Sequence, residues 1–235
     1  FRSTKPNSIS DFTGRPPVFD LCGPVEGDRI LDLGCGEGYC ARELASRGAA
    51  DILGLDLSDA MIERARKQEA ERPQGIRFEQ HDIVSLDLPD DSFDLALGVF
   101  VFSYLSIEQM SRAFREVRRI LKPGGRFVFS VPHPSLPFFR PAEPPFFFDR
   151  GDGGYFSGRD QRWEGQIDCV DGRSLPVQMV HKTIEDFFDA MRTAGFQQLP
   201  IVREHRALEP HWQPHPDVFR PLLDVPLQLA ARIEG

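Results

Sequence analysis

The residues with the clearest chemical potential are an aspartate and three glycines at the end of a short apolar run. Asp32 lies within the run from 29 to 33, and Gly34, Gly36 and Gly38 follow at alternate positions. Glycine adopts the unusual backbone angles that such a turn requires, and its missing Cβ lets a ligand approach the backbone. The carboxylate beside the turn disfavours phosphate groups and favours a positively charged nucleoside that carries none.

The segment after the glycines is typical of a helix. It runs from Tyr39 to Arg47 and is closed by Gly48, which stands at the position where glycine commonly ends a helix. A buried strand, a glycine turn and a helix form the first half of a mononucleotide-binding unit. The spacing differs from the G-x-G-x-x-G of dinucleotide-binding loops. The loop alone also fits a glycine turn in an unrelated α/β protein.

Two further acids follow predicted strands. Asp56 closes an apolar strand spanning 50–57 and stands about 20 residues beyond the glycine loop, the offset at which an acid hydrogen-bonds ribose hydroxyls. Asp82 ends a third strand within 74–83, which alternates between apolar and polar residues. Ligands of open α/β sheets bind at the carboxyl ends of the strands. The three acids are therefore expected to meet at one edge of the sheet, although Asp82 alone also fits a turn aspartate.

The rest of the chain supplies the elements that must position these residues. The apolar segment 93–99 is typical of a central parallel strand that is covered on both faces. Further expected elements are a helix at 107–121, a strand at 126–131, a hairpin pairing 166–170 with 175–181, a helix from Thr183 to Ala194, and final strands at 198–203 and 227–233. The pattern predicts an α/β fold with a doubly wound, mostly parallel sheet and a cap inserted after the fifth strand.

Residues 28–131 resemble the class I S-adenosylmethionine-dependent methyltransferases, in the glycine loop, the acids after the strands and the Leu-Lys-Pro-Gly-Gly turn at 121–125. The resemblance implies a seven-stranded sheet with an antiparallel edge hairpin. It also implies S-adenosyl-L-methionine as cofactor and S-adenosyl-L-homocysteine as product. The implied cofactor-binding residues are Asp32, Gly34, Cys35, Gly36, Asp56, Leu57, Met61, Asp82, Ile83, Gly98, Val99 and Phe100.

Within that family the resemblance gives these positions different parts of the ligand. It places Leu57 and Met61 beside the adenine, and it has Asp82 accept a hydrogen bond from the exocyclic amine. Amino methyltransferases of DNA and protein often carry an Asn/Asp-Pro-Pro-aromatic turn after the fourth strand. This chain has Gly-Val-Phe-Val-Phe-Ser-Tyr at 98–104 instead, which favours a small-molecule acceptor.

Two segments are candidates to cover the site. Residues 132–162 are rich in proline and phenylalanine, and exposing so many aromatic side chains would forfeit burial energy. We expect a lid over an apolar substrate pocket there, with a packed arm or a dimer contact as the alternative. Residues 1–28 fit either a second lid or a segment packed on the sheet edge, and Asn7 and Arg15 are the polar groups of interest in them.

Composition limits the possible functions. The chain has 235 residues, 40% of them hydrophobic, and a net charge of −8, so it lacks the basic footprint of a nucleic-acid or anionic-membrane binder. No apolar run reaches the ~20 residues that span a membrane. The four cysteines form no C-x-x-C pair and are interpreted as reduced thiols of a cytoplasmic protein.

No metal site is expected, since prolines at 210, 214 and 216 argue against a helix that would bring His211 and His215 together. The predicted division of the chain is an N-terminal lid (1–28), a cofactor-binding core (29–131), a cap insert with a hairpin (132–182) and a C-terminal completion of the sheet (183–235). A homodimer is a further possibility.

No nucleophile elbow or Walker loop is present. This fits methyl transfer, in which the protein mainly aligns the acceptor and excludes water. A general base is required only if the acceptor carries a proton. His133, just past the fifth strand, is the catalytic candidate, and Tyr104 and His181 are the others. His133 also fits a loop histidine bracketed by two prolines.

The leading hypothesis is a methyltransferase acting on O or N of a small, partly apolar molecule. A quinone or lipid-precursor methyltransferase is the alternative within enzymes. A non-catalytic domain that binds S-adenosylmethionine and regulates a partner comes from another class. An NAD dehydrogenase is a third option, against which the loop spacing and Asp32 argue.

Overall fold

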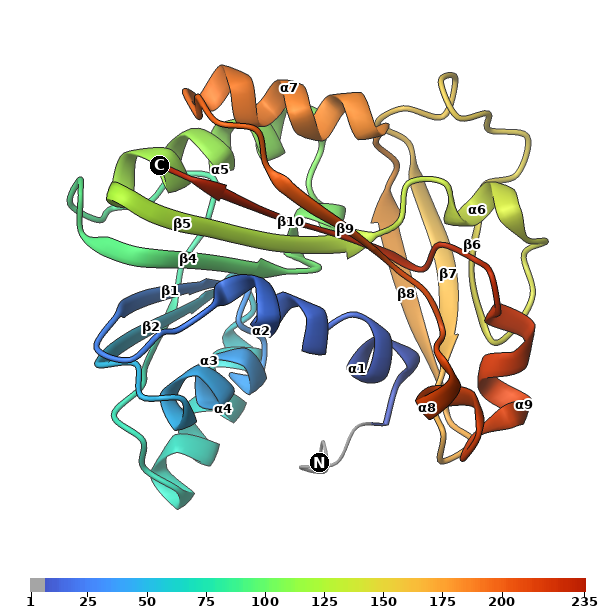
Figure 1. Ribbon diagram of the computed structural model, residues 1–235, viewed down its shortest axis with the longest axis horizontal. Coiled ribbons are helices and arrows are strands. Elements are labelled where there is room, and N and C mark those ends of the chain that lie inside the picture. The colour runs from blue at the N-terminus through green and yellow to red at the C-terminus, as the bar shows by residue number, and fades with distance from the viewer. Residues whose placement is uncertain (1–6) are drawn as a thin grey trace.

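The computed structural model describes residues 7–235 and has a central sheet covered by helices on both faces (Figure 1). In the described residues the sheet has seven strands in the order β3-β2-β1-β4-β5-β10-β9. The strands are β1 (Arg29–Leu33), β2 (Asp51–Asp56), β3 (Arg77–Gln80), β4 (Phe93–Val99), β5 (Leu121–Pro132), β9 (Ile201–His205) and β10 (Gln228–Glu234). The first five in chain order pair in parallel, and β10 pairs antiparallel with both β5 and β9. The predicted α/β fold and its antiparallel edge are confirmed.

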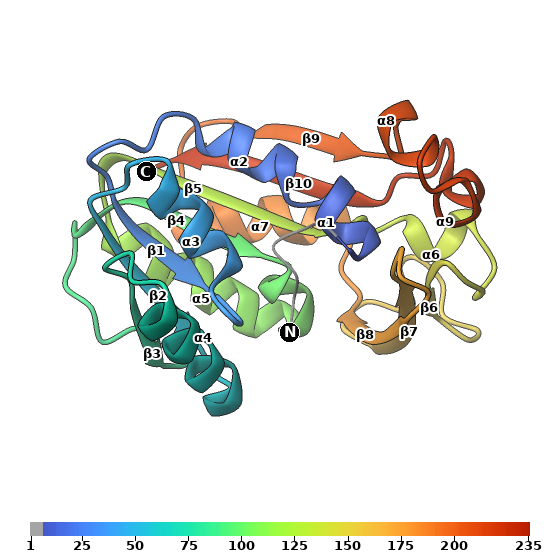
Figure 2. The same cartoon turned by 90° about the horizontal axis from the view of Figure 1, so that it is seen from below.

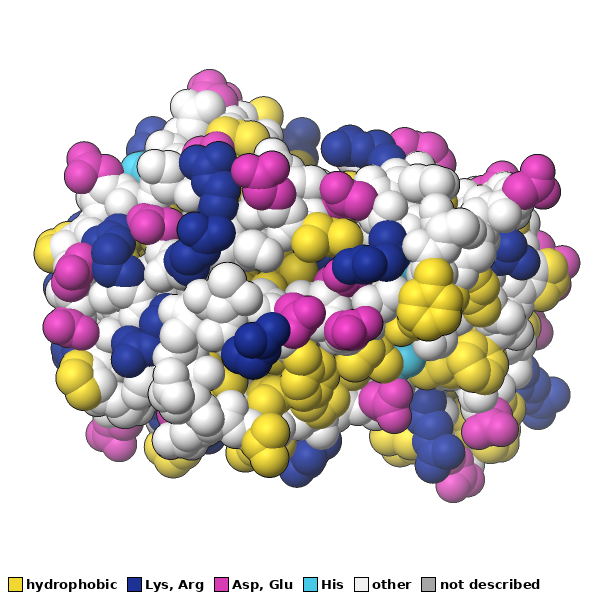
Figure 3. All heavy atoms as spheres, turned by 90° about the horizontal axis from the view of Figure 1, so that it is seen from above, with side chains coloured by type: hydrophobic (Ala, Val, Ile, Leu, Met, Phe, Trp, Pro, Cys, Tyr) yellow, Lys and Arg dark blue, Asp and Glu magenta, His cyan; other side chains and the backbone are white. Residues whose placement is uncertain are grey.

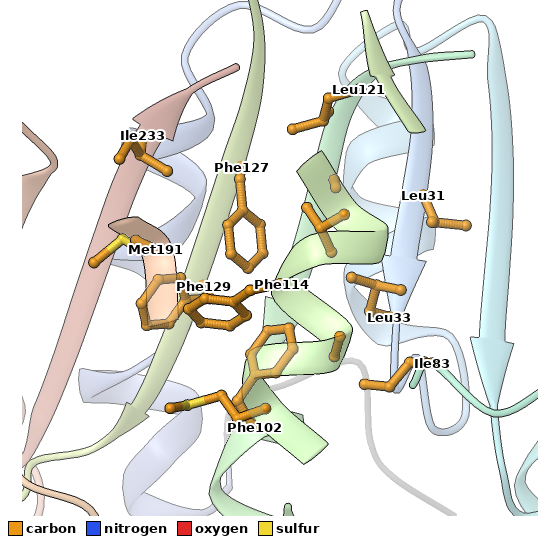
Figure 4. Packing of buried hydrophobic residues seen from close by; sticks show 14 of the residues in the cluster. Leu31, Leu33, Ile83, Phe102, Phe114, Leu121, Phe127, Phe129, Met191 and Ile233 are labelled. Atoms are coloured by element: carbon orange, nitrogen blue, oxygen red, sulfur yellow. The ribbon is translucent and has the colours of Figure 1, made fainter. Parts of the chain in front are cut away.

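Helices lie on the two faces of this sheet because their apolar sides match its two apolar surfaces. The helices are α1 (Ile9–Thr13), α2 (Pro16–Cys22), α3 (Tyr39–Ser46), α4 (Asp59–Glu71), α5 (Ile107–Ile120) and α7 (Ile184–Ala194). Phenylalanines of β5 and α5 form the centre of one buried cluster, in which Phe114 meets Phe127 with ring centroids 5.0 Å apart (Figure 4). On the other face α2, α3 and α4 cover the sheet (Figure 2).

The ends of the two long helices on the α5–α7 face follow from local sequence. Ser106 begins α5 and Thr183 begins α7, each with a reciprocal capping box to the third helical residue. Gly195 ends α7 with a φ of 97°, a left-handed conformation that glycine tolerates without strain. After α5 the Lys-Pro-Gly-Gly turn is not a separate loop as predicted, since β5 already begins at Leu121 and pairs with Phe93 before a register shift.

The insert folds into α6 (Leu136–Phe139) and a three-stranded antiparallel sheet rather than a loop. Its strands are β6 (Phe146–Asp149), β7 (Arg162–Asp168) and β8 (Ser174–Val180), in the order β6-β7-β8. The predicted hairpin is present, with Asp168 opposite Ser174, but its first strand begins four residues earlier than expected. The β6 strand has no counterpart in the prediction because its Phe-Phe-Phe run lacks alternation.

A third buried cluster joins the insert to distant parts of the chain. It contains Trp163 and Met179 of the small sheet, Ile9 of α1, and Phe219 and Leu227 from the segment before β10. The insert therefore shares its core with both ends of the chain and is a packed layer, not a detached arm. The four-part division of the chain stays a prediction.

The proline-rich segment 209–216 differs from the prediction. A helix was not expected there, yet α8 (Glu209–Trp212) and α9 (Pro216–Phe219) each form one turn, and η2 (Arg220–Leu222) follows. Proline stands in the first turn of each, where its missing N–H costs nothing. The rings of His211 and His215 both contact Phe12 and so serve packing.

One buried lysine makes the junction between β8 and α7 sensitive to pH. Lys182 is 1% exposed and its Nζ donates to the carbonyl of Val180 at 2.9 Å. Burial lowers the pKa of Lys182 from its usual 10.5 to about 7, although the charges of Asp160 and Asp186 oppose the shift. Between pH 7 and 10.5 the unfolded chain binds a proton that the folded chain does not, so this group makes stability rise with pH.

We expect Lys182→Met to stabilise the protein near neutral pH by up to about 5 kcal/mol, with the gain fading as pH rises toward 10.5. Urea unfolding at pH 6.5, 8 and 9.5 measures this. A gain that is independent of pH would contradict the buried, uncharged lysine. Exposed Lys67, changed to Met, is the control.

Candidate active site

The candidate site lies where the sheet reverses its strand order, between β1 and β4. The chain leaves β1 toward β2 on one side and leaves β4 toward β5 on the other. A crevice forms outside the carboxyl ends of the strands at such a switch point, and α/β proteins bind ligands there. The glycine loop after β1 and the segment η1 (Val101–Tyr104) after β4 are its two walls.

The glycine loop needs its glycines for two distinct reasons. Gly34, Gly36 and Gly38 have φ values of 65°, 55° and 82°, a region that other residues enter only at a cost. A Cβ on Gly34 would lie 2.4 Å from Cγ2 of Val101, so this glycine lets the two walls touch. A Cβ on Gly36 would meet nothing within 4 Å, so its backbone faces open space at the site.

Asp32 lies beneath the loop and not in the crevice. Its side chain is 1% exposed, and Oδ2 accepts the backbone N–H of Ala41, in the first turn of α3, at 3.1 Å. Burial raises the pKa of Asp32 from its usual 3.8 to about 7, the Ala41 bond lowers it, and the charge of Asp56 raises it further. The structure gives Asp32 a role in holding the loop to α3, and its contact with a ligand stays a prediction.

Asp56 ties the end of β2 to the glycine loop. Its Oδ2 accepts the N–H of Gly36 at 2.8 Å and its Oδ1 accepts the N–H of Ser58 at 2.9 Å. The carboxylate is half-buried, so it borders the crevice at the place where the sequence predicts ribose binding. Cys35 is buried and points its Sγ inward, close to Gly54, which leaves only its backbone for a ligand.

The predicted adenine-binding residues surround the same edge. Leu57 is 67% exposed, an unusual state for a leucine, and Met61 is half-buried on the first turn of α4. Asp82 is exposed beyond β3, with Oδ1 accepting the N–H of Val84 at 2.9 Å, and the neighbouring Ile83 is buried. Leu57 and Asp82 thus expose an apolar side chain and an acid after two neighbouring strands, β2 and β3.

The opposite wall begins at Gly98, Val99 and Phe100, at the end of β4. A Cβ on Gly98 would lie 2.4 Å from the Phe102 ring, so only glycine lets η1 fold back there. Phe100 has a φ of 66°, a strained conformation for an aromatic residue. Its N–H donates to the carbonyl of Ser130 at 2.8 Å, and its carbonyl accepts the hydroxyl of Ser103 at 2.6 Å.

The N-terminal segment closes over this wall. A Cβ on Gly14, which joins α1 to α2, would lie 2.6 Å from the tip of the Phe100 ring. Arg15 pairs with Asp11 and lies over the ring of Tyr39 at 4.7 Å. Asn7 reaches the insert, since its Nδ2 donates to the carboxylate of Asp171 at 3.0 Å. The segment thus bridges the site and the hairpin of the insert.

The proposed base, His133, is fully engaged in hydrogen bonds. It is 3% exposed, and its Nδ1 accepts the N–H of Ser135 at 3.1 Å. Nε2 therefore carries the proton and donates to Glu204 at 2.8 Å. Burial lowers the pKa of His133, while Glu204 opposes the shift. In this tautomer both ring nitrogens of His133 are bonded within the protein, and its catalytic role stays a prediction.

The other candidate bases differ. His181 is fully buried, and its Nε2 donates to the Tyr155 carbonyl at 2.9 Å while the ring stacks on Trp163. Tyr104 is 45% exposed on η1 and borders the crevice wall.

Membrane-spanning helices, metal sites and disulfides are absent from residues 7–235. No helix among residues 7–235 is long and apolar enough to cross a membrane. No group of His, Cys, Asp and Glu in the described chain has the arrangement of a metal site. The four cysteines are buried and form no disulfide. On the face shown in Figure 3, acidic, basic and apolar side chains are interspersed.

Asp32→Asn tests the buried carboxyl. Between pH 3.8 and about 7 the folded chain binds a proton that the unfolded chain does not, so Asp32 makes stability fall as pH rises. We expect the stability difference, variant minus wild type, to grow by up to about 4 kcal/mol between pH 4.5 and pH 8. Parallel curves in urea titrations would contradict this, and exposed Asp189→Asn serves as control.

Comparison with known proteins agrees with this geometry. A family model described as a methyltransferase domain matches residues 30–125. An uncharacterised protein of Haemophilus influenzae is 27% identical over 88% of this chain and 82% of its own. Aklanonic acid methyltransferase from a Streptomyces species is 34% identical over 54% of this chain, and the chain spans only 60% of that enzyme.

Solved structures match over nearly the whole chain. A protein from Listeria monocytogenes has a TM-score of 0.71 at 21% identity, covering 93% of this chain and 95% of its own, and shares the fold. The crystal structure of an S-adenosylmethionine-dependent methyltransferase from Mesorhizobium loti also has a TM-score of 0.71, at 30% identity. The match extends over 94% of this chain and 96% of that protein. With its glycine loop, its strand order and this likeness, the chain belongs to the class I S-adenosylmethionine-dependent methyltransferases.

Proposed function

We propose that this methyltransferase binds S-adenosyl-L-methionine across the carboxyl ends of β1, β2 and β4 and methylates O or N of a small, partly apolar molecule. The observation that carries the proposal is the junction of Gly36 and Asp56. The backbone of Gly36 faces open space, and its nitrogen lies 2.8 Å from Oδ2 of the half-buried Asp56 carboxylate. Both residues lie at the switch point of the sheet. Such a pair suits a ligand with a hydroxylated sugar and no phosphate.

The residues around this pair divide the remaining work. Leu57 and Met61 offer apolar contact to the base, and Asp82 offers an acceptor for its amine. Gly98, Val99 and Phe100 line the wall where the methionine part belongs, and Gly34 and Cys35 complete the floor with backbone. When bound, the cofactor supplies an activated methyl group, whose bond to sulfur breaks as the acceptor attacks, leaving S-adenosyl-L-homocysteine and a proton. The chain's own task is to align the acceptor and keep water out.

The acceptor class is supported by the apolar surroundings and by relatives. The wall is built from Phe100 and η1, and the packed insert lies beside η1. Named relatives include methyltransferases of aklanonic acid and of 27-O-demethylrifamycin SV, at 34% identity each over about half of this chain. A demethylmenaquinone methyltransferase, 37% identical over 46% of the chain, supports the quinone alternative. A homodimer and a cytoplasmic location stay predictions.

A role without methyl transfer is the second candidate function. A specific observation favours considering it: the structure of a [4+2]-cyclase has the same fold, with a TM-score of 0.63 at 22% identity. Likeness in fold therefore does not by itself supply the reaction. Methyl transfer from labelled cofactor to a panel of phenols, quinones, acids and amines separates the two.

Asp56→Ala tests the cofactor site. It removes the acceptor for both ribose hydroxyls and frees the loop N–H, so we expect S-adenosyl-L-homocysteine to bind about 10- to 100-fold more weakly, by roughly 1.4 to 3 kcal/mol. Isothermal titration calorimetry measures the affinity. Exposed Asp189→Ala, on α7, is the matched control. Equal affinity in the Asp56 variant would remove the proposed ribose contact.

His133→Ala tests whether that histidine acts as a general base or supports the fold. Because both ring nitrogens are already bonded within the protein, we expect a loss of stability of about 1–3 kcal/mol. The pH dependence of kcat/KM on an acceptor from the panel should keep its shape. The disappearance of one limb of that profile, with the fold intact by circular dichroism, would restore His133 as a base.

A further inference from the structure

Two polar side chains are buried without partners on one face of the sheet. Ser130 of β5 and Gln228 of β10 are both 0% exposed. The hydroxyl of Ser130 and both amide atoms of Gln228 have no hydrogen-bond partner among the described residues. Buried polar groups are almost always hydrogen-bonded, because leaving them unpaired costs the whole desolvation of the group. Unpaired groups in the interior therefore call for an explanation.

The register places these two side chains together. Ser130 is opposite Ala230, and Gln228 is opposite Pro132, so the two polar residues are diagonal neighbours on adjacent strands. Residues two apart on a strand share a face. Val128 and Ala230 belong to the cluster under α2, which assigns Ser130 and Gln228 to the face that α1 and α2 cover. Glutamine is long enough to act together with a diagonal neighbour.

The pair is adjacent to the wall of the proposed cofactor site. Ser130 is opposite Val99, the last residue of β4, and its carbonyl accepts the N–H of Phe100. The Phe100 ring in turn contacts Gly14 beneath the N-terminal segment. The unpaired groups thus lie one strand beyond the residues assigned to the methionine part of the cofactor.

A cavity lies on the same face, over the outermost strand β9. It has a volume of about 320 Å³ and is lined by Thr13 of α1, Pro17 of α2 and His205 of β9, among others. His205 is opposite Gln228 across the strands, and its Nε2 is also buried without a partner among residues 7–235. Three neighbouring strands therefore present unpaired polar atoms beneath α1 and α2.

The charges on this face indicate a neutral ligand. Arg15, next to Gly14, pairs with Asp11, and Arg232, further along β10, donates to Glu234 at 2.7 Å. Each of these guanidinium groups already has a carboxylate partner, although Nε of Arg232 is buried without a hydrogen-bond partner among the described residues. Burying a ligand carboxylate beside a hydroxyl and an amide would leave its charge uncompensated. A carbonyl or a hydroxyl needs only the donors and acceptors that Ser130 and Gln228 carry.

We propose that Ser130 and Gln228 recognise a neutral oxygen function, a carbonyl or a hydroxyl, of the methyl acceptor. The inference rests on the proposed function and narrows its acceptor to a neutral, oxygenated and otherwise apolar molecule. Ser130 and Gln228 are specificity-determining residues in this account. Leaving these groups unpaired lowers the stability of the free protein, and a bound acceptor supplies the missing hydrogen bonds.

Stability gives a test that needs no acceptor. Ser130→Ala and Gln228→Met each remove an unpaired polar group at nearly constant shape, so we expect Tm to rise by about 2–5 °C. The matched control is Ser92→Ala, because the Ser92 hydroxyl is bonded to the Pro89 carbonyl at 2.6 Å and its loss should lower Tm. A fall in Tm for Ser130→Ala and Gln228→Met would show that both groups serve the fold, and would overturn the proposal.

Ligand binding gives the second test, by calorimetry in the presence of S-adenosyl-L-homocysteine. We expect 2′-hydroxyacetophenone to bind wild type and to bind each variant at least ten-fold more weakly, while ethylbenzene, which has neither a carbonyl nor a hydroxyl, binds all three proteins alike. Preference for salicylate, no binding of 2′-hydroxyacetophenone to wild type, or equal binding to the variants would overturn the inference. Failure of S-adenosyl-L-homocysteine itself to bind wild type would instead refute the proposed function, so the two failures are distinguishable.

Discussion

The bond between the Asp56 carboxylate and the N–H of Gly36 is the constraint on which the site depends. It fixes the loop after β1 to the end of β2 and sets the distance between an open backbone and an acid. Asp32 supports the same loop from below through Ala41. Two carboxylates thus hold a loop that has three glycines of positive φ at alternate positions, and the loop keeps its shape although the glycines contribute no side-chain packing.

The opposite wall is held by close packing of side chains against glycines and not by carboxylates. Gly34 lets Val101 approach the loop, Gly98 lets Phe102 fold back, and Gly14 lets the N-terminal segment touch Phe100. In this arrangement the backbone of Phe100 is strained, and its hydrogen bonds to Ser130 and Ser103 offset the strain. A wall assembled from three chain segments can fit a small acceptor closely. This suits methyl transfer, in which alignment of the acceptor contributes to the rate.

The sequence revealed much of the fold, and its assignments of site residues stay predictions. Apolar runs and glycines gave β1, β4 and the ends of α7 with correct bounds, because hydrophobic period and helix caps are local properties. Asp56 and Asp82 were singled out from their places at the ends of strands, and Asp32 from its place before the glycine loop. The bond from Asp32 to Ala41 was not predicted because a sequence does not show which way a carboxylate turns. The α8 and α9 turns were missed because proline was taken only as a helix breaker.

By itself, the sequence determined the family and the order of the strands of the central sheet, because these follow from spacing along the chain. Only the tertiary structure decided what His133 can do, since Ser135 is near in sequence but Glu204 arrives from another strand. Only the tertiary structure also brought Ser130 and Gln228 together, through an antiparallel pairing of residues almost 100 positions apart. Long-range pairing is a property of the whole packed chain, which no local pattern encodes.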